Sequence, residues 1–280
     1  MNLDLEVTLL MLGAALMHAS WNTMLKSSES KLLDTTLIVA FGSLIALACL
    51  PFLPLPERAS WPWIGLSVTL HLFYYFALIG AYRHGDLSHT YPLMRGTAPL
   101  LIALAGPLVL SEHLPLQGWL GILLISFGII APAFKSLAHP GTHRATMYAL
   151  ANGAIIAAYT IVDGKGARLS GHAIAYSQWL FFLDGFALTA IAYYRHGRAV
   201  TAYALRRWRP GLIGALLSMG AYVIAIWAMT RAPVAMVAAL RETSVVIAAI
   251  LGASLLKEPL GIWRIAGAVL VVVGILTLKA

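Results

Sequence analysis

Long apolar runs separated by short polar stretches make up almost the whole chain. A helix needs roughly 20 apolar residues to cross about 30 Å of hydrocarbon. The runs predict ten such helices and leave no segment for a separate soluble domain. The predicted ranges are 3–25, 33–53, 61–82, 86–110, 115–134, 145–163, 172–194, 209–230, 234–256 and 260–278.

The second half of the chain repeats the first. When residues 85–130 are placed over residues 231–276 without a gap, Arg95 falls on Arg241 and Glu112 on Glu258. Several small residues coincide in the same register: Thr97 with Thr243, Gly106 with Gly252, Gly121 with Gly267 and Gly128 with Gly274. Five helices per half is an odd number, so the second half must enter the membrane from the opposite side. We therefore expect two inverted repeats, residues 1–138 and 139–280, around a central cavity.

Composition and charge agree with a membrane protein. Hydrophobic residues make up 60% of the chain and charged residues 11%, whereas soluble domains carry about 25% charged residues. The net charge of +8 lies between the apolar runs, which favours loops beside anionic lipid over a nucleic-acid site. Five arginines cluster in the predicted seventh-to-eighth loop: Arg195, Arg198, Arg206, Arg207 and Arg209. We expect this loop to be cytoplasmic and both termini to lie outside.

Four charged residues lie well inside predicted helices, where burying a charge costs a few kcal/mol: Arg95, Asp184, Arg241 and Glu242. Arg95 and Arg241 are the repeat-related pair. Arginine keeps its charge and offers two parallel donors to a carboxylate, phosphonate or phosphate. One interpretation is therefore a solute site, and the other is neutralisation by Asp184 or Glu242. Each of these acids is in turn a candidate either for proton coupling or for a permanent ion pair, and His18 is a further candidate for proton coupling.

Polar and aromatic residues recur inside the same helices. Each alone is explained by packing, but together they indicate an amphipathic cavity with hydrogen-bonding groups. The predicted members of this cavity are His18, Trp21, Asn22, Tyr75, Tyr91, Tyr159, Trp179 and Tyr222, and His71 and Tyr74 accompany Tyr75 in the third range. The chain has no phosphate-binding P-loop, no His-Glu-x-x-His zinc motif and no Gly-x-Ser-x-Gly elbow, so we predict no cofactor, no metal site and no enzyme.

Several motifs resemble the drug/metabolite transporter superfamily, in its EamA-like branch. They are His-Ala-Ser-Trp-Asn at 18–22 followed by Lys26, Tyr-Pro-Leu-Met-Arg-Gly at 91–96, and the turns at Glu112 and Glu258. The resemblance implies a secondary carrier with a central cavity and alternating access, and many such carriers are exporters. The second half departs from the first, because Ala157, Ala158 and Tyr159 stand near the positions of Ala19, Ser20 and Trp21 without the histidine. We therefore expect an asymmetric cavity.

The resulting interpretation is a multi-pass secondary transporter of the inner (plasma) membrane. Its partners are the lipid bilayer and a small polar or amphipathic metabolite, such as an amino acid or another compound with a carboxylate or phosphonate, with a proton as candidate coupling ion. An exporter of organic cations or drugs, bound by cation–π contacts, is the alternative within this class. An integral-membrane enzyme acting on lipid-linked substrates is the alternative from another class.

Overall fold

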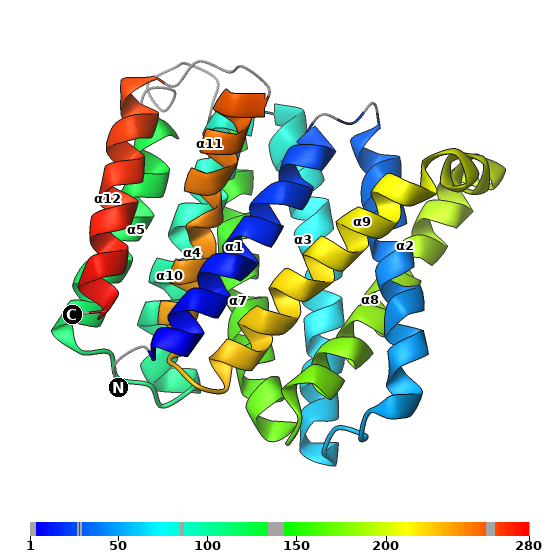
Figure 1. Ribbon diagram of the computed structural model, residues 1–280, viewed down its shortest axis with the longest axis horizontal. Coiled ribbons are helices and arrows are strands. Elements are labelled where there is room, and N and C mark those ends of the chain that lie inside the picture. The colour runs from blue at the N-terminus through cyan, green and yellow to red at the C-terminus, as the bar shows by residue number, and fades with distance from the viewer. Residues whose placement is uncertain are drawn as a thin grey trace.

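The computed structural model describes residues 4–26, 28, 30–84, 87–133, 143–255 and 261–279. Within these residues all regular secondary structure is helical (Figure 1). The helices are α1 (Leu5–Lys26), α2 (Lys31–Cys49), α3 (Trp61–His84), α4 (Leu87–Val109), α5 (Leu116–Ile130), α7 (His143–Leu169), α8 (Ala173–His196), α9 (Arg198–Met229), α10 (Val234–Glu242), α11 (Ser244–Leu255) and α12 (Ile262–Lys279). Short 3-10 turns cover Leu50–Phe52, Arg58–Ser60 and Ala131–Ala133.

Each of the ten predicted ranges contains helix, and eight helical segments of the described chain are long and apolar enough to cross a membrane. The eight are Lys31–Phe52, His89–Val109, Leu116–Ala133, His143–Leu169, Ala173–His196, Arg198–Met229, Val234–Leu251 and Ile262–Lys279. Large apolar side chains are exposed along their outer surfaces, as expected for helices that face lipid rather than water. The chain is therefore a multi-pass membrane protein.

The prediction that the arginine cluster lies in a long loop between the seventh and eighth helices is wrong. Helix α8 continues to His196 and α9 begins at Arg198, so only Gly197, with a φ of +52°, separates them. No glycine or proline lies between Arg198 and Trp208, so the polar residues mark the edge of the apolar region and not the end of a helix. The helix does kink at Arg207, where φ is −119° and ψ is 22°. Pro210 lacks the N–H that would bond to the Arg206 carbonyl, which explains the position of the kink.

The predicted ninth helix is also not continuous, because Thr243 separates α10 from α11. The Thr243 hydroxyl donates a hydrogen bond to the Leu240 carbonyl at 2.7 Å, a bond that competes with the helical pattern. The break follows directly after Arg241 and Glu242. It therefore places two buried charged residues at the end of a nine-residue helix inside the protein.

Small residues allow α5 and α12 to pack closely, as their spacing predicts. A Cβ atom added at Gly128 would lie 2.6 Å from the Gly267 carbonyl oxygen, and one at Gly274 would lie 2.9 Å from the Gly121 carbonyl oxygen. Such separations exclude a side chain. Close backbone contact of this kind stabilises helix pairs in lipid, where the hydrophobic effect between helices is weak.

The helices run between two ends of the molecule that differ in charge. The terminal end carries the start of α1, the end of α12 and the α7–α8 connection, and both chain termini are labelled there in Figure 1. Its basic residues are Arg58, Lys165, Arg168, Arg231 and Lys279. The opposite end, called the basic end here, carries Lys31, Arg83, Arg144, Arg195, Arg198, Arg206, Arg207, Arg209 and Arg264. The loop basic residues Lys135 and Lys257 lie outside the described residues.

Candidate functional site

A cavity of about 160 Å³ lies at the centre of the helices, with walls from α1, α2, α3, α4, α7, α8, α9 and α10. The structure brings ten of the twelve predicted site residues to this cavity. They are His18, Trp21, Asn22, Tyr75, Tyr91, Arg95, Tyr159, Asp184, Tyr222 and Arg241. His71, Tyr74 and Phe181 complete its aromatic and polar wall. Residues that are far apart in the sequence thus meet around one space.

Two predicted residues do not line the cavity. Trp179 lies edge-to-face against Trp61, with ring centroids 4.9 Å apart, and packs on an apolar cluster with Ile64. Its position suits helix packing. Glu242 lies behind the two arginines with a fully buried side chain.

Glu242 is the acid that pairs with the arginines. Its Oε2 atom lies 2.6 Å from Nε of Arg95, and its Oε1 atom lies 3.7 Å from Nε of Arg241. These contacts are electrostatic, because none of the four atoms has a partner in hydrogen-bond geometry. Asp184, the other acid considered, forms no ion pair in the part of the chain that the structure describes. One carboxylate therefore faces two guanidinium groups.

The two guanidinium groups differ in what surrounds them. Arg95 has the shorter contact with Glu242, and its Nη2 atom lies 3.4 Å from Nε2 of His18. Arg241 has Nε and Nη2 atoms that are buried without a hydrogen-bond partner among the described residues, and its Cζ atom lies 5.9 Å from the centre of the Tyr222 ring. Arg241 thus keeps donors for a further anion, whereas Arg95 is largely neutralised.

Interruptions in the helices position both arginines. Pro92 and Pro99 lie inside α4 on either side of Arg95. Pro99 lacks the N–H that would bond to the Arg95 carbonyl. Arg241 lies two residues before the break at Thr243. Broken helices at membrane depth are tolerated where they line a cavity, and transporters use them to build solute sites.

The sequence interpretation missed the buried acid beside the cavity, Asp163. Its side chain is fully buried, Oδ1 accepts a hydrogen bond from the Tyr176 hydroxyl at 3.0 Å, and Oδ2 accepts one from the Tyr222 hydroxyl at 2.5 Å. The predicted helix ended at this residue, but α7 continues to Leu169 and places Asp163 inside the protein. The stretch Asp163-Gly164-Lys165-Gly166 is polar and glycine-rich and resembles a turn, so the sequence pattern gave no signal that the helix continues.

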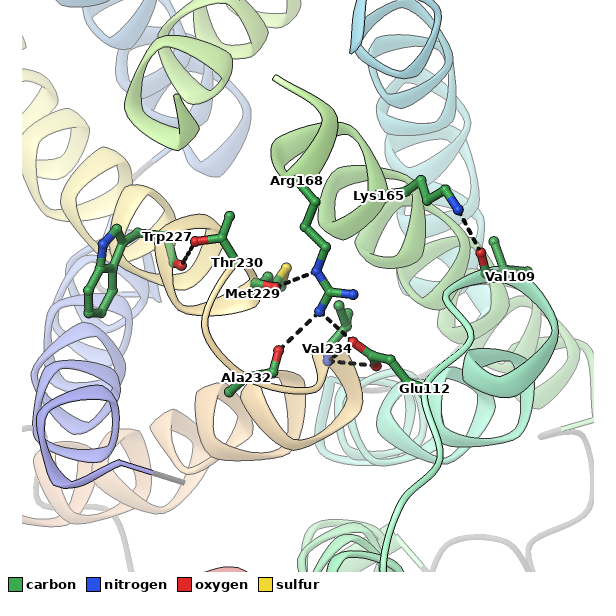
Figure 2. Close-up of polar contacts among 9 residues, drawn as sticks. All are labelled: Val109, Glu112, Lys165, Arg168, Trp227, Met229, Thr230, Ala232 and Val234. Atoms are coloured by element: carbon green, nitrogen blue, oxygen red, sulfur yellow. Dashed lines mark hydrogen bonds and ion pairs between the residues drawn. The ribbon is translucent and has the colours of Figure 1, made fainter. Parts of the chain in front are cut away.

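Contacts among charged groups and backbone atoms join helix ends at the terminal end (Figure 2). Arg168 donates from Nε to the Met229 carbonyl at 2.8 Å and from Nη2 to the Ala232 carbonyl at 3.1 Å, and it forms an ion pair with Glu112. The Glu112 carboxylate also accepts a hydrogen bond at 2.9 Å from the N–H of Val234, the first residue of α10. These contacts join the α4–α5 turn, the end of α7 and the α9–α10 connection. The repeat-related Glu258 lies outside the described residues.

Comparisons with known proteins identify the family. No curated protein matches the chain. A solved structure, described only as the crystal structure of a protein, superposes with a TM-score of 0.74 at 17% sequence identity, over 97% of this chain and 96% of the other. At that identity the likeness shows the fold alone. The sequence model of the EamA-like transporter family matches residues 6–131 and again residues 143–279. These matches cover nearly the whole chain, which therefore belongs to the EamA-like transporter family.

Proposed function

We propose that this protein is a secondary transporter that carries a small amphipathic solute with an anionic group through the central cavity. The observation that carries the proposal is the environment of Arg241. Glu242 supplies one negative charge to two guanidinium groups and lies closer to Arg95. Because arginine keeps its charge, Arg241 retains an unbalanced charge at the cavity wall, and its Nη2 donor has no hydrogen-bond partner among the described residues. A carboxylate or phosphonate of the solute would supply the missing anion.

The rest of the cavity suits an amphipathic solute. Trp21, Tyr75 and Phe181 supply aromatic surface, and Asp184 has a buried Oδ1 atom without a hydrogen-bond partner. A solute with both a carboxylate and an ammonium group, such as an amino acid, would satisfy Arg241 and Asp184 together. Asp184 and the aromatic rings also support the second candidate, an organic cation held by one carboxylate and by cation–π contacts.

The transport cycle that we propose is alternating access between two inverted five-helix halves, residues 1–138 and 139–280, with ten membrane spans. Support comes from the two family matches, one in each half, and from the position of the cavity between helices of both. At the terminal end, Glu112 and Arg168 hold the helix ends together. Trp21, Asn22 and Tyr91 lie in the parts of α1 and α4 that are nearer the basic end.

We further propose that the basic end is cytoplasmic, because basic residues are retained beside anionic lipid. The closed terminal end then faces outward, and the structure corresponds to a state that receives solute from the cytoplasm. This direction agrees with an exporter of the inner membrane. An enzyme acting on lipid-linked substrates is less well supported, since the buried charged groups surround a central cavity and do not gather near one interface.

Counterflow in proteoliposomes tests the proposal. The purified protein is reconstituted in vesicles loaded with one of three unlabelled compounds, L-leucine, phenylphosphonate or benzyltrimethylammonium, and entry of the same compound in labelled form is measured against protein-free vesicles. We expect counterflow of L-leucine or phenylphosphonate. Counterflow of benzyltrimethylammonium alone would favour the organic-cation alternative, and counterflow of none of the three would overturn the proposed function.

A further inference from the structure

His71 lies on α3 at the cavity wall with one ring nitrogen already committed. Its Nδ1 atom lies 2.9 Å from the Ser67 carbonyl oxygen. A carbonyl oxygen can only accept, so this shorter contact favours the tautomer with hydrogen on Nδ1, and the Ser67 hydroxyl lies 3.3 Å from the same atom. The ring stacks on Tyr159 with centroids 4.3 Å apart, and Tyr222 lies edge-on at 6.3 Å. The remaining nitrogen, Nε2, is the atom that can gain or lose a proton.

Asp163 supplies a buried negative charge beside this ring. Both of its oxygens accept hydrogen bonds from tyrosine hydroxyls, the role of an ionised carboxylate. Tyr222 lies between Asp163 and His71, because its hydroxyl donates to the carboxylate and its ring lies edge-on to the imidazole. No lysine or arginine forms an ion pair with Asp163 in the described chain. A protonated His71 is therefore the natural counter-cation.

The groups around His71 come from each helix that packs against α3. The titratable and charged side chains that line the same cavity are Tyr159 from α7, Asp184 from α8, Tyr91 and Arg95 from α4, Tyr222 from α9, His18 from α1, Arg241 from α10, and Tyr74 and Tyr75 from α3 itself. Asp163 of α7 and Tyr176 of α8 are joined to this set through the Tyr222 hydroxyl. Asp184 is the second acid at this cavity. Arg58, in the turn before α3, is exposed at the terminal end.

The cavity contains a second histidine in the opposite environment. Nε2 of His18 lies 3.4 Å from Nη2 of Arg95, so a proton added at His18 would face a permanent positive charge. His71 is linked to the Asp163 carboxylate through Tyr222 and shares the cavity wall with Asp184. The distribution of charge in the cavity therefore favours His71 over His18 as the group that takes up a proton.

We propose that His71 and Asp163 form the proton-binding site through which this carrier couples solute movement to a proton gradient. A proton from one side of the membrane bonds to Nε2, and the same proton leaves Nε2 to the other side after the cavity changes its opening. Throughout this exchange Nδ1 keeps its hydrogen, and the carboxylate of Asp163 keeps its charge. The coupling part of this inference rests on the proposed transport function, whereas proton binding does not.

Tyr222 connects the proton site with the proposed solute site. Its hydroxyl donates to Asp163, its ring edge faces His71, and the guanidinium of Arg241 lies over its face. A change of charge at His71 and Asp163 therefore reaches the side chain that contacts Arg241. This single residue supplies a direct physical route between proton binding and solute binding.

Histidine NMR of the protein without solute tests proton binding. Labelled protein in lipid nanodiscs is titrated from pH 5 to pH 9, and the His71 signal is identified by its loss in His71→Gln. We expect one proton to bind, and we expect Asp163→Asn to lower the proton affinity of His71 at least tenfold, as loss of a nearby opposite charge does. The control Asp4→Asn, at the start of the chain, should leave it unchanged.

A His71 signal that does not titrate, or one that titrates alike in Asp163→Asn, would overturn the proton site. If Asp163→Asn does not fold, Tyr222→Phe gives a second test. Loss of its hydroxyl leaves more charge on Asp163, so the proton affinity of His71 should rise severalfold, and an unchanged affinity would again overturn the site.

Solute accumulation driven by a pH gradient tests coupling. The probe is the compound among the three above that shows counterflow, and the measured quantity is uptake with a gradient divided by uptake without one. We expect this uptake ratio to be at least ten for the natural protein and for the control His84→Gln. For His71→Gln we expect a ratio of one, even if this variant still shows counterflow. A ratio of one for the natural protein overturns coupling. Absence of counterflow overturns the transport proposal instead, and the NMR titration still decides the proton site.

Discussion

Replacement of Glu242 by glutamine tests the charge distribution of the cavity. The side chain is fully buried and is the shared counter-anion of two arginines, so Glu242→Gln leaves both guanidinium groups in a low-dielectric interior without a partner. Removal of one partner of a buried ion pair costs about 3–5 kcal/mol. We expect a loss in this range, or more, in the free energy of unfolding.

Arg95→Gln should cost less than Glu242→Gln. After this change Glu242 still has Arg241 at 3.7 Å, compared with 2.6 Å for the lost contact. Coulomb attraction falls inversely with distance, so the remaining contact keeps roughly 70% of the attraction of the lost one at equal dielectric. The double variant should be more stable than the sum of the single effects predicts, by at least about 2 kcal/mol, because it removes both charges of one pair.

Equilibrium unfolding in mixed micelles of dodecyl maltoside and sodium dodecyl sulfate measures these differences. Glu57→Gln, at an exposed carboxylate of the terminal end, is the matched control and should change stability by less than about 0.5 kcal/mol. Additive effects of Arg95→Gln and Glu242→Gln, or natural stability of Glu242→Gln, would refute the shared ion pair.

Three further predictions concern packing, closure and orientation. Gly128→Leu should destabilise the protein by about 1–3 kcal/mol, because a Cβ atom at this position meets the α12 backbone. The control Gly13→Leu should cost less, because open space surrounds Gly13, and equal effects would contradict the α5–α12 contact. Ser218 lines the cavity, and a single cysteine there in a background without Cys49 reports access to the cavity. Glu112→Gln should increase the labelling of this cysteine from the terminal side at least severalfold, and unchanged labelling would exclude closure by Glu112. A single cysteine at Ala59, exposed in the turn before α3 at the terminal end, should react with an impermeant maleimide in intact cells, and reaction only after lysis would reverse the orientation.

The sequence predicts the helices and most of the cavity for a physical reason. Apolar run length is a local property, and burial of a charge in lipid is costly enough that Arg95, Arg241 and Asp184 must face the interior. The repeat register brings the two arginines to equivalent places. Neither property depends on knowing how the helices cross.

Other features require the three-dimensional arrangement. The choice of Glu242 over Asp184 as the arginines' partner depends on the break at Thr243, which a hydropathy pattern does not show. The same pattern ended a helix at Asp163, because a polar residue at a range boundary resembles a loop. Trp179 was assigned to the cavity, but a helix pattern alone does not say which neighbouring ring it packs against.

Counterflow of the natural protein beside Arg241→Gln tests the central claim most directly. Arg231→Gln is the matched control, because Arg231 is an exposed arginine at the terminal end and does not line the cavity. Its guanidinium lies over the Trp227 ring. The account predicts that Arg241→Gln lowers the initial counterflow rate at least tenfold in a folded, inserted protein, while Arg231→Gln transports at the natural rate. Natural counterflow by Arg241→Gln would contradict the assignment of Arg241 as the group that receives the solute anion.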